Sequence, residues 1–233
     1  MAWRCTGATN TELIGNMAKA QVINSSRVAA AMAKVDRANY VRFPDSAYED
    51  SPQPIGHGAT ISAPHMHAYA AEHLLPFLKP GAHVLDVGSG SGYLSAVLYQ
   101  LLQDPSDPRS RDSKVIGIEH IPELTEWSIG NLRKDGLGPE LDEGRIKVIS
   151  GDGRKGLPED GPYDAIHVGA AAPTMPKDLV EQLARPGRMF VPVGTLAQQV
   201  FQVDKDADGN VTEKPLFDVM YVPLTDRDKQ IST

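Results

Sequence analysis

The segment His83–Tyr93 combines a carboxylate with a glycine-rich turn, two features that suit the binding of a nucleotide-like ligand. Its first half is an apolar run interrupted only by Asp86, as in a strand buried on both faces of a parallel sheet. Gly88, Gly90 and Gly92 follow at alternate positions, and a helical pattern comes directly after them. A strand, a glycine turn and a helix point backbone N–H groups at a ligand, and glycine has no Cβ to hold that ligand away.

This turn can be compared with three known patterns. A dinucleotide site has a third glycine where this chain has Tyr93, and a serine-hydrolase elbow has its nucleophile where this chain has Gly90. An acid two residues before G-x-G-x-G, here Asp86 before Gly88, is the pattern found in S-adenosylmethionine-dependent methyltransferases. The turn therefore favours S-adenosylmethionine as the ligand.

Two further acids lie where a nucleoside needs partners. Glu119 closes the second apolar run, where a carboxylate can accept both ribose hydroxyl groups, and Asp152 follows the third run, where it can accept the adenine amino group. Glu119 lies further from the turn than the usual distance of about 20 residues, and the loop 104–113 accounts for the excess. One such acid is better explained as a helix cap or a solvated loop residue. Three in register, with Asp86, favour one shared ligand because the carboxyl ends of parallel strands converge.

Alternating strands and helices are predicted to position these residues. The alternation indicates an α/β fold with a doubly wound, mostly parallel, Rossmann-like sheet, an antiparallel C-terminal strand pair and a helical N-terminal extension. We expect a single domain, 1–233, in which 1–80 form the N-terminal helical and substrate-site segment, 81–204 the cofactor-binding core, and 205–233 the last strand and a lid tail. The predicted strands are 83–87, 115–119, 146–150, 164–169, 188–193, 200–203 and 217–222, and the predicted helices are 11–20, 28–35, 66–78, 93–99, 122–134 and 179–183.

Two segments outside this alternation carry local signals. Ser25 or Ser26 can cap the second helix, whose residues Val28, Met32 and Val35 share one face. The stretch 104–113 is rich in proline, serine, aspartate and arginine, and this composition predicts a solvated surface loop.

Composition excludes several classes of protein. The 233 residues carry a formal charge of −7, which argues against general affinity for nucleic acid. A single cysteine, Cys5, rules out an internal disulfide framework and fits a reducing compartment. The first residues lack the apolar core of a signal peptide, and no apolar run approaches the roughly 20 residues that span a bilayer. We expect a soluble, cytoplasmic protein that binds neither nucleic acid nor membrane.

Two metal-like patterns have simpler explanations. His65 and His67 are two positions apart and diverge on a helix, so they and His57 are not expected to form a metal site. The stretch 204–209 copies the start of an EF-hand loop, but Pro215 stands where the loop needs glutamate. We predict a hairpin turn there and no bound metal.

The chain as a whole resembles the protein-L-isoaspartate (D-aspartate) O-methyltransferase family, eukaryotic type. The similarity runs from Ala2 to Gln230, with a longer loop near Pro105 and with Glu119 where animal members have aspartate. The segments that carry it are 59–68 (ATISAPHMHA), 85–92 (LDVGSGSG), 151–154 (GDGR), 162–173 (PYDAIHVGAAAP) and 221–226 (YVPLTD).

This resemblance implies a protein-repair enzyme. The family transfers the methyl group of S-adenosyl-L-methionine to the free α-carboxylate of L-isoaspartyl and D-aspartyl residues, releasing S-adenosyl-L-homocysteine. The ester then collapses to a succinimide, which reopens partly to normal aspartate. Its partners are damaged proteins and peptides, and we expect a monomer. A tail from Thr225 to Gln230 would close over the cofactor.

The resemblance also implies the residues of the site. Ser62 is the candidate for the hydrogen bond that aims the substrate carboxylate, although it can equally be an N-cap before Pro64. A carboxylate with a pKa near 4 is ionised at neutral pH, so placement alone is required and no general base is needed. The residues expected at the cofactor are Ala59, Thr60, Ile61, Ser62, His67, Asp86, Gly88, Ser89, Gly90, Glu119, His120, Asp152, Gly153, Thr225 and Gln230.

Two other classes of function stay open at this point. The same fold supports methyltransferases that act on nucleic acids or small molecules. Against base methylation, the fourth strand ends in His167-Val168-Gly169-Ala170 and lacks the Pro-Pro-aromatic clamp of those enzymes. A non-catalytic adaptor that only binds the cofactor is the other class, and the intact turn, acids and Ser62 segment argue against it.

Overall fold

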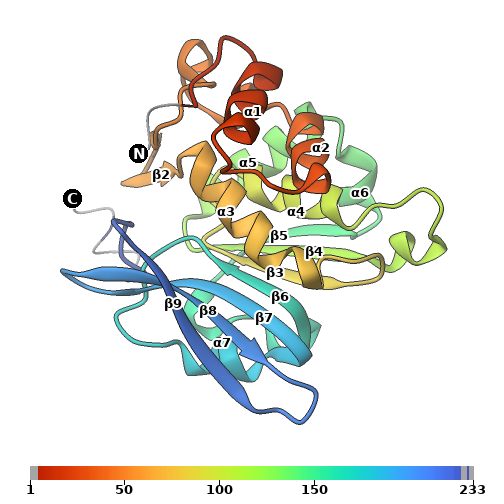
Figure 1. Cartoon of the computed structure of the whole chain (residues 1–233), viewed down its shortest axis with the longest axis vertical. Coiled ribbons are helices and arrows are strands. Elements are labelled where there is room, and N and C mark those ends of the chain that lie inside the picture. Colours follow the sequence, from red (N-terminus) through yellow and green to blue (C-terminus); the bar gives the residue numbers. More distant parts are fainter. Residues whose placement is uncertain (1–4, 227–229, 231–233) are drawn as a thin grey trace.

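A seven-stranded sheet forms the centre of the protein, shown in a computed structural model that describes residues 5–226 and 230 (Figure 1). The strand order is β5-β4-β3-β6-β7-β8-β9, parallel from β5 through β7 and antiparallel for β7, β8 and β9. This arrangement confirms the predicted fold class. The strands are β3 (His83–Val87), β4 (Lys114–Glu119), β5 (Ile146–Ser150), β6 (Tyr163–Val168), β7 (Leu183–Gly194), β8 (Gln198–Lys205) and β9 (Val211–Val219).

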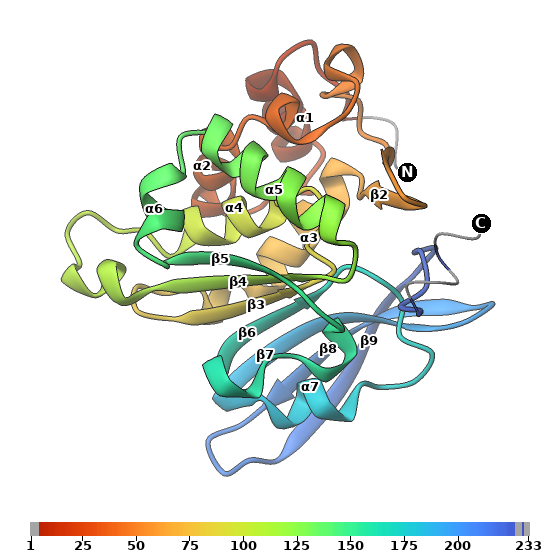
Figure 2. The same cartoon turned by 180° about the vertical axis from the view of Figure 1, so that it is seen from behind.

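Helices cover the two faces of the sheet unequally. Helices α1 to α6 lie on one side and α7 lies on the other, as the two opposite views show (Figures 1 and 2). The helices are α1 (Asn10–Lys19), α2 (Ser26–Lys34), α3 (Pro64–Leu74), α4 (Tyr93–Leu101), α5 (Pro122–Lys134), α6 (Gly138–Asp142) and α7 (Lys177–Glu181). None of the helices in the described part of the chain is both long and apolar enough to cross a membrane.

Alternation along the strands divides the core into two clusters. In β3, Val84 belongs to the cluster under α1 to α5, whereas Leu85 belongs to the cluster that contains Leu179 of α7. Successive side chains of a strand point to opposite faces, so a strand buried on both faces is apolar throughout. This confirms the interpretation of these runs as doubly buried strands.

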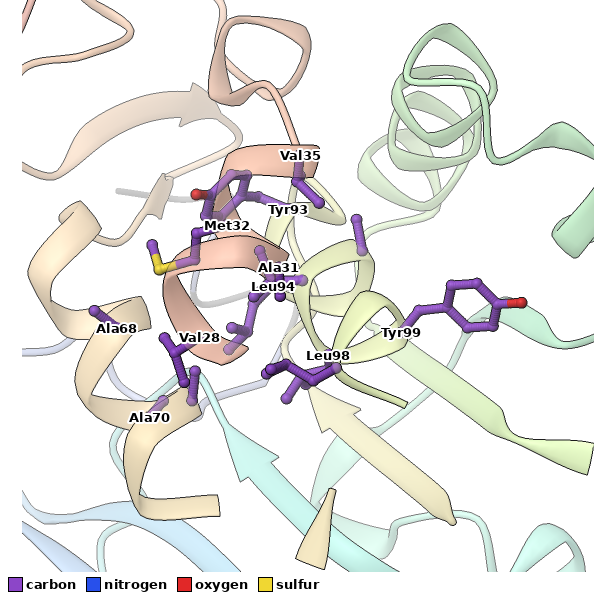
Figure 3. Close-up of a cluster of buried hydrophobic side chains, with 14 of the residues drawn as sticks. Val28, Ala31, Met32, Val35, Ala68, Ala70, Tyr93, Leu94, Leu98 and Tyr99 are labelled. Carbon is purple, nitrogen blue, oxygen red and sulfur yellow. The ribbon is translucent and has the colours of Figure 1, made fainter. Parts of the chain in front are cut away.

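The N-terminal helix α1 packs against α2, and α2 packs against α4, which lies on the sheet. Val28 and Met32, with Val35 at the end of the helix, are fully buried, as predicted. Val28 and Met32 lie on the side of α2 towards Ala68 and Ala70 of α3, whereas Ala31 lies beside Leu94 of α4 (Figure 3). The hydroxyl group of Ser25 accepts a hydrogen bond from the backbone N–H of Arg27 and caps the helix. The predicted division of the chain at residues 80 and 204 stays a prediction.

Strand boundaries near the C-terminus differ from the predictions. Leu183, placed in a helix by its spacing, begins β7 because it is buried beside Tyr163 of β6. The last strand, β9, begins at Val211 and ends before the predicted 217–222 does. The turn between β8 and β9 is a hairpin turn, as expected.

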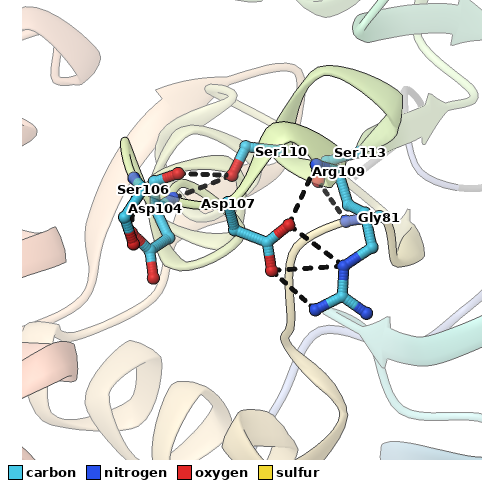
Figure 4. A network of polar contacts seen from close by, with 7 residues as sticks. All are labelled: Gly81, Asp104, Ser106, Asp107, Arg109, Ser110 and Ser113. Atoms are coloured by element: carbon cyan, nitrogen blue, oxygen red, sulfur yellow. Dashed lines mark hydrogen bonds and ion pairs between the residues drawn. The ribbon is translucent and has the colours of Figure 1, made fainter.

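The loop between α4 and β4 is more ordered than its composition suggested. It contains a 3-10 helix, Pro108–Asp112, and Asp107 both caps this helix and pairs with Arg109 at 2.6 Å (Figure 4). The buried hydroxyl group of Ser113 accepts a hydrogen bond from the N–H of Gly81 at 2.9 Å. The insertion that separates Glu119 from the glycine turn is thus folded against the base of β3.

Candidate active site

A cleft opens at the carboxyl ends of the parallel strands. The empty space between its walls, open solvent at the mouth included, is about 570 Å³. The predicted residues that line this cleft are Ala59, Thr60, Gly88, Gly90, Glu119, His120, Asp152, Gly153, Thr225 and Gln230.

A smaller cavity lies deeper, beside the glycine turn. The remaining predicted site residues, Ile61, Ser62, His67, Asp86 and Ser89, line it. Thr60, Gly88 and Gly90 border both spaces, so the two are adjacent. The structure thus brings all the predicted site residues to one region.

The strand that carries Ala59–Ile61, β2, forms a two-stranded sheet with β1 (Gln53–Gly56). Both residues of the connecting turn, His57 and Gly58, have positive φ, 53° and 67°. A two-residue turn with positive φ at both positions is the tight hairpin connection. The hairpin presents Thr60 and its neighbours to the cleft.

The glycine turn has the predicted conformation but not the predicted donors. Gly88, Gly90 and Gly92 all have positive φ, at 75°, 51° and 84°. The N–H groups of Gly88 and Ser89, however, donate to the carbonyl of Ile118, and that of Gly90 donates to Glu119. The expectation that these N–H groups point at the ligand is wrong, because the neighbouring strand β4 takes them. These three N–H groups are therefore not available to a ligand.

Glu119 is buried at the end of β4 with each carboxylate oxygen held by one backbone group. Oε2 accepts from the N–H of Gly90 and Oε1 from that of Ile121, both at 3.0 Å. Burial raises the pKa of Glu119, and the two N–H groups oppose that shift. A carboxylate oxygen can accept more than one hydrogen bond, so both oxygens can still accept hydroxyl groups in the cleft.

Asp152 both lines the cleft and caps a helical turn. It accepts the backbone N–H of Arg154 at 3.1 Å, and the Arg154 guanidinium pairs with it at 2.8 Å and with Asp226 at 2.9 Å. The hydrogen bond from Arg154 lowers the pKa of Asp152. Asp152 is therefore both a helix cap and a residue of the cleft.

Asp86 lies deeper than the other two acids. It is buried, with Oδ1 2.8 Å from Nδ1 of His167 and Oδ2 accepting from the Ser95 hydroxyl at 2.6 Å. It borders the smaller cavity and not the wide cleft. Sequence reasoning missed His167 as its partner, although the two residues are neighbours in the β3–β6 register.

Ser62 is not the helix cap. Ala63 is the N-cap of α3 and makes no side-chain cap bond, with Pro64 in the first turn. The Ser62 side chain instead interacts with Tyr221, a residue that sequence reasoning did not place in the site, and lowers its pKa against the larger, opposite effect of burial. The N-cap alternative is wrong because Ala63 occupies the N-cap position and α3 begins at Pro64.

Gln230 lies at the mouth of the cleft. Its Oε1 is 2.8 Å from Nε2 of His120, and its Nε2 donates to the carbonyl of His57 at 3.0 Å. Of the expected lid tail, 227–229 lie outside the described residues.

Comparison with known proteins assigns the family. A model of the family Protein-L-isoaspartate(D-aspartate) O-methyltransferase matches residues 8–229. The protein-L-isoaspartate O-methyltransferase of Caenorhabditis elegans is 47% identical over 232 residues, which cover 99% of this chain and 98% of the relative. The chain belongs to the protein-L-isoaspartate(D-aspartate) O-methyltransferase family.

Other relatives of this methyltransferase agree in sequence and fold. Protein-L-isoaspartate O-methyltransferase 1 of Arabidopsis thaliana is 46% identical over 222 residues, 95% of this chain and 94% of the relative. A crystal structure of the Plasmodium falciparum protein-L-isoaspartate O-methyltransferase, in complex with S-adenosyl-L-homocysteine, superposes with a TM-score of 0.84. It is 34% identical and covers 94% of this chain and 99% of its own. The predicted family, its eukaryotic type and its cofactor are confirmed.

The residues of this methyltransferase fit its cofactor. The Ser89 hydroxyl is buried at the smaller cavity and has no hydrogen-bond partner among the described residues, so it is available to a polar ligand group. Glu119 offers acceptors for hydroxyl groups in the adjoining cleft. No group of three or more His, Cys, Asp or Glu residues in the described ranges could hold a metal ion.

His65 pairs with a buried acid, Asp50. Oδ1 of Asp50 accepts a hydrogen bond from the backbone N–H of His65 at 3.0 Å. The same oxygen lies 2.7 Å from Nδ1 of the His65 ring. Burial alone would raise the pKa of Asp50, but the bonds from His65 outweigh it and the pKa is lowered. A lowered pKa means that Asp50 stabilises the fold above about pH 4, and that this stability is lost as the pH falls through the folded-state value.

Asp50→Asn is therefore expected to lower the free energy of unfolding at pH 7 by about 1.5–3 kcal/mol, the usual contribution of charged hydrogen bonds. The difference from wild type should shrink as the pH falls below about 4, because the unfolded chain then binds a proton at this residue, and it should vanish only below the lowered pKa of folded Asp50. Urea unfolding of both proteins at pH 7 and pH 3 measures this. An equal difference at the two pH values would show that the charge of Asp50 plays no part.

Proposed function

We propose that this protein methylates the free α-carboxylate of L-isoaspartyl and D-aspartyl residues in damaged proteins and peptides, with S-adenosyl-L-methionine as donor. The resulting ester collapses to a succinimide, which returns part of the material to L-aspartate. The family membership supports the reaction, and the position of Ser62 supports the arrangement of its two substrates.

The observation that carries this proposal is the position of Ser62 between two cavities. Ser62 lines both the smaller cavity beside the glycine turn and a third, wide cavity. The third cavity is predominantly apolar, with Pro52, Met66 and the largely exposed Met220 along it. An open apolar surface beside a polar site suits the side chains that flank a damaged residue in a polypeptide.

We propose that Ser62 donates a hydrogen bond to one oxygen of the incoming carboxylate and so aims the other oxygen at the methyl group. S-adenosyl-L-methionine, when bound, supplies an activated methyl group on a sulfonium. The carboxylate is ionised at neutral pH, so no protein group has to remove a proton. Glu119 would accept the ribose hydroxyl groups, and Asp152 would accept the adenine amino group across the cleft.

An isoaspartyl peptide and its normal aspartyl twin, each incubated with tritiated S-adenosylmethionine, test the proposal. We expect base-labile label on the isoaspartyl peptide and none above background on the twin. A tRNA or DNA substrate in a third arm tests nucleic-acid methylation. Absence of base-labile label on the isoaspartyl peptide would refute the proposal. If the cofactor still binds, that result would favour a binding adaptor.

We also propose that the protein acts as a monomer in the cytosol. Cys5, buried and unpaired, fits a reducing compartment. Light scattering coupled to size exclusion should give the mass of one chain, about 25.2 kDa, and a mass of two chains would contradict it.

A further inference from the structure

Arg37 is a fully buried charge next to the site. It lies in a short 3-10 helix, Arg37–Tyr40, and none of the ion pairs among the described residues involves it. Burial lowers the pKa of Arg37 to about 10, so the side chain is still a cation at neutral pH. A buried charge is costly unless it is paired, and its retention here needs an explanation.

The guanidinium group connects two segments of the site. Nη2 donates to the carbonyl oxygen of Ser62 at 2.8 Å, and Nη1 lies 3.4 Å from Nδ1 of His67. The group also lies 5.2 Å from the ring centroid of Tyr93. One side chain therefore contacts both the extended segment before α3 and the first turns of that helix.

These contacts determine the state of His67. Arginine has only donors, so Nδ1 of His67 must be the acceptor and the ring proton must be on Nε2. Burial, and then the charge of Arg37, hold the pKa of His67 well below its usual value, so the ring is neutral. His67 lines the smaller cavity and thus brings a neutral ring with an Nε2–H donor to it.

We propose that Arg37 is a positioning residue for methyl transfer: it fixes the backbone of Ser62 and the Nε2–H tautomer of His67 at once. The proposal rests on the function proposed above, in which Ser62 aims the substrate carboxylate. Lysine cannot replace Arg37 fully, because a single ammonium group lacks the planar fork that reaches two acceptors in fixed directions.

Nitrogen-15 NMR of the histidine rings tests the tautomer without any substrate. In the wild type, the His67 signal, assigned by its loss in His67→Gln, should show a protonated Nε2 and an unprotonated Nδ1. In Arg37→Met the two tautomers should mix, and the pKa of His67 should rise towards the ordinary value because a neighbouring positive charge is gone. A purely structural role for Arg37 would leave the tautomer unchanged.

Kinetics test the positioning of Ser62. Arg37→Met should lower kcat for an isoaspartyl peptide by about 100-fold, as a displacement of about 1 Å at a reacting group does. The Kd for S-adenosyl-L-homocysteine should rise less, by about tenfold at most, because Arg37 reaches the cofactor site only through His67. Arg37→Lys should restore the low pKa of His67 but not the full kcat.

Arg27 provides a matched control. Its Nη2 also donates to two backbone carbonyl groups, of Leu78 at 2.7 Å and Leu101 at 2.9 Å, away from both cavities. Arg27→Met should lower Tm and leave kcat and KM near wild type. If Arg37→Met behaves like this control, or if His67 keeps its tautomer, the proposal is wrong.

The outcomes separate this proposal from the proposed function. A wild type that methylates no isoaspartyl peptide refutes the function, while the NMR result still decides the role of Arg37 at His67. If Arg37→Met does not fold, Arg37→Lys decides the question: wild-type kcat in that variant refutes the proposal, and a lowered kcat with unchanged Tm supports it.

Discussion

Replacement of Glu119 by alanine is expected to raise the Kd for S-adenosyl-L-homocysteine by about 10²–10⁴. Two hydrogen bonds from ribose hydroxyl groups to the carboxylate would be lost, each worth about 1.5–3 kcal/mol. The same change leaves the N–H groups of Gly90 and Ile121 without the acceptors they have in the structure. Titration calorimetry with the purified protein measures the Kd, and circular dichroism verifies the fold.

Two further variants make the Glu119 experiment specific. Glu119→Asp keeps a carboxylate at the end of β4 and should bind the cofactor more tightly than Glu119→Ala. Glu123→Ala removes an acid in the first turn of α5, outside the residues that line the two cavities, and should leave the Kd unchanged. An alanine variant at Glu119 with wild-type affinity would show that the ribose has another partner.

The acids of the site were predictable because each follows a local rule. Glu119 ends an apolar run, and strand ends in a parallel sheet meet at one edge, so its position in the cleft follows from the order of the runs. Helix α5 could be bounded at Pro122 and Lys134 because proline and the flanking residues mark its ends. Such features depend on a few neighbouring residues only.

Arg37, His167 and Tyr221 could not be found in the same way. Arg37 contacts Ser62 across 25 positions and His167 contacts Asp86 across 81, so neither contact has a signal at fixed spacing. Both become visible once the register of the sheet and the packing of the N-terminal segment are known. The sequence predicts which strand ends meet, whereas the partners of a buried charge depend on packing from elsewhere in the chain.

The glycine turn illustrates the same limit. Its three positive φ angles could be expected from the glycines alone, since other residues rarely adopt them. The directions of its N–H groups depend on β4, which offers the Ile118 carbonyl and the Glu119 carboxylate as acceptors. Glu119 therefore has two tasks, to hold the turn and to face the ligand, and this adds to the effect expected from its replacement.

Ser62→Ala should lower kcat for an isoaspartyl peptide by about 10- to 100-fold, since the carboxylate loses the hydrogen bond that orients it. The Kd for S-adenosyl-L-homocysteine should change little, because Ser62 also lines the third cavity, where the substrate is expected. The hydrogen bond from Arg37 to the backbone carbonyl at position 62 is retained in the variant. Rapid-quench kinetics and calorimetry measure the two quantities separately. An unchanged kcat/KM would remove Ser62 from the mechanism.

Ser25→Ala is the matched control for Ser62, because Ser25 does cap a helix. It should lower the free energy of unfolding by about 1 kcal/mol and leave kcat unchanged, as loss of an N-cap does. Ser62→Ala should show the opposite pattern, since the Ser62 side chain caps no helix and interacts with Tyr221. Tyr221→Phe then separates the two roles of the hydroxyl group: if Tyr221 orients Ser62 towards the carboxylate, this variant should lower kcat in part, and combining it with Ser62→Ala should add no further loss.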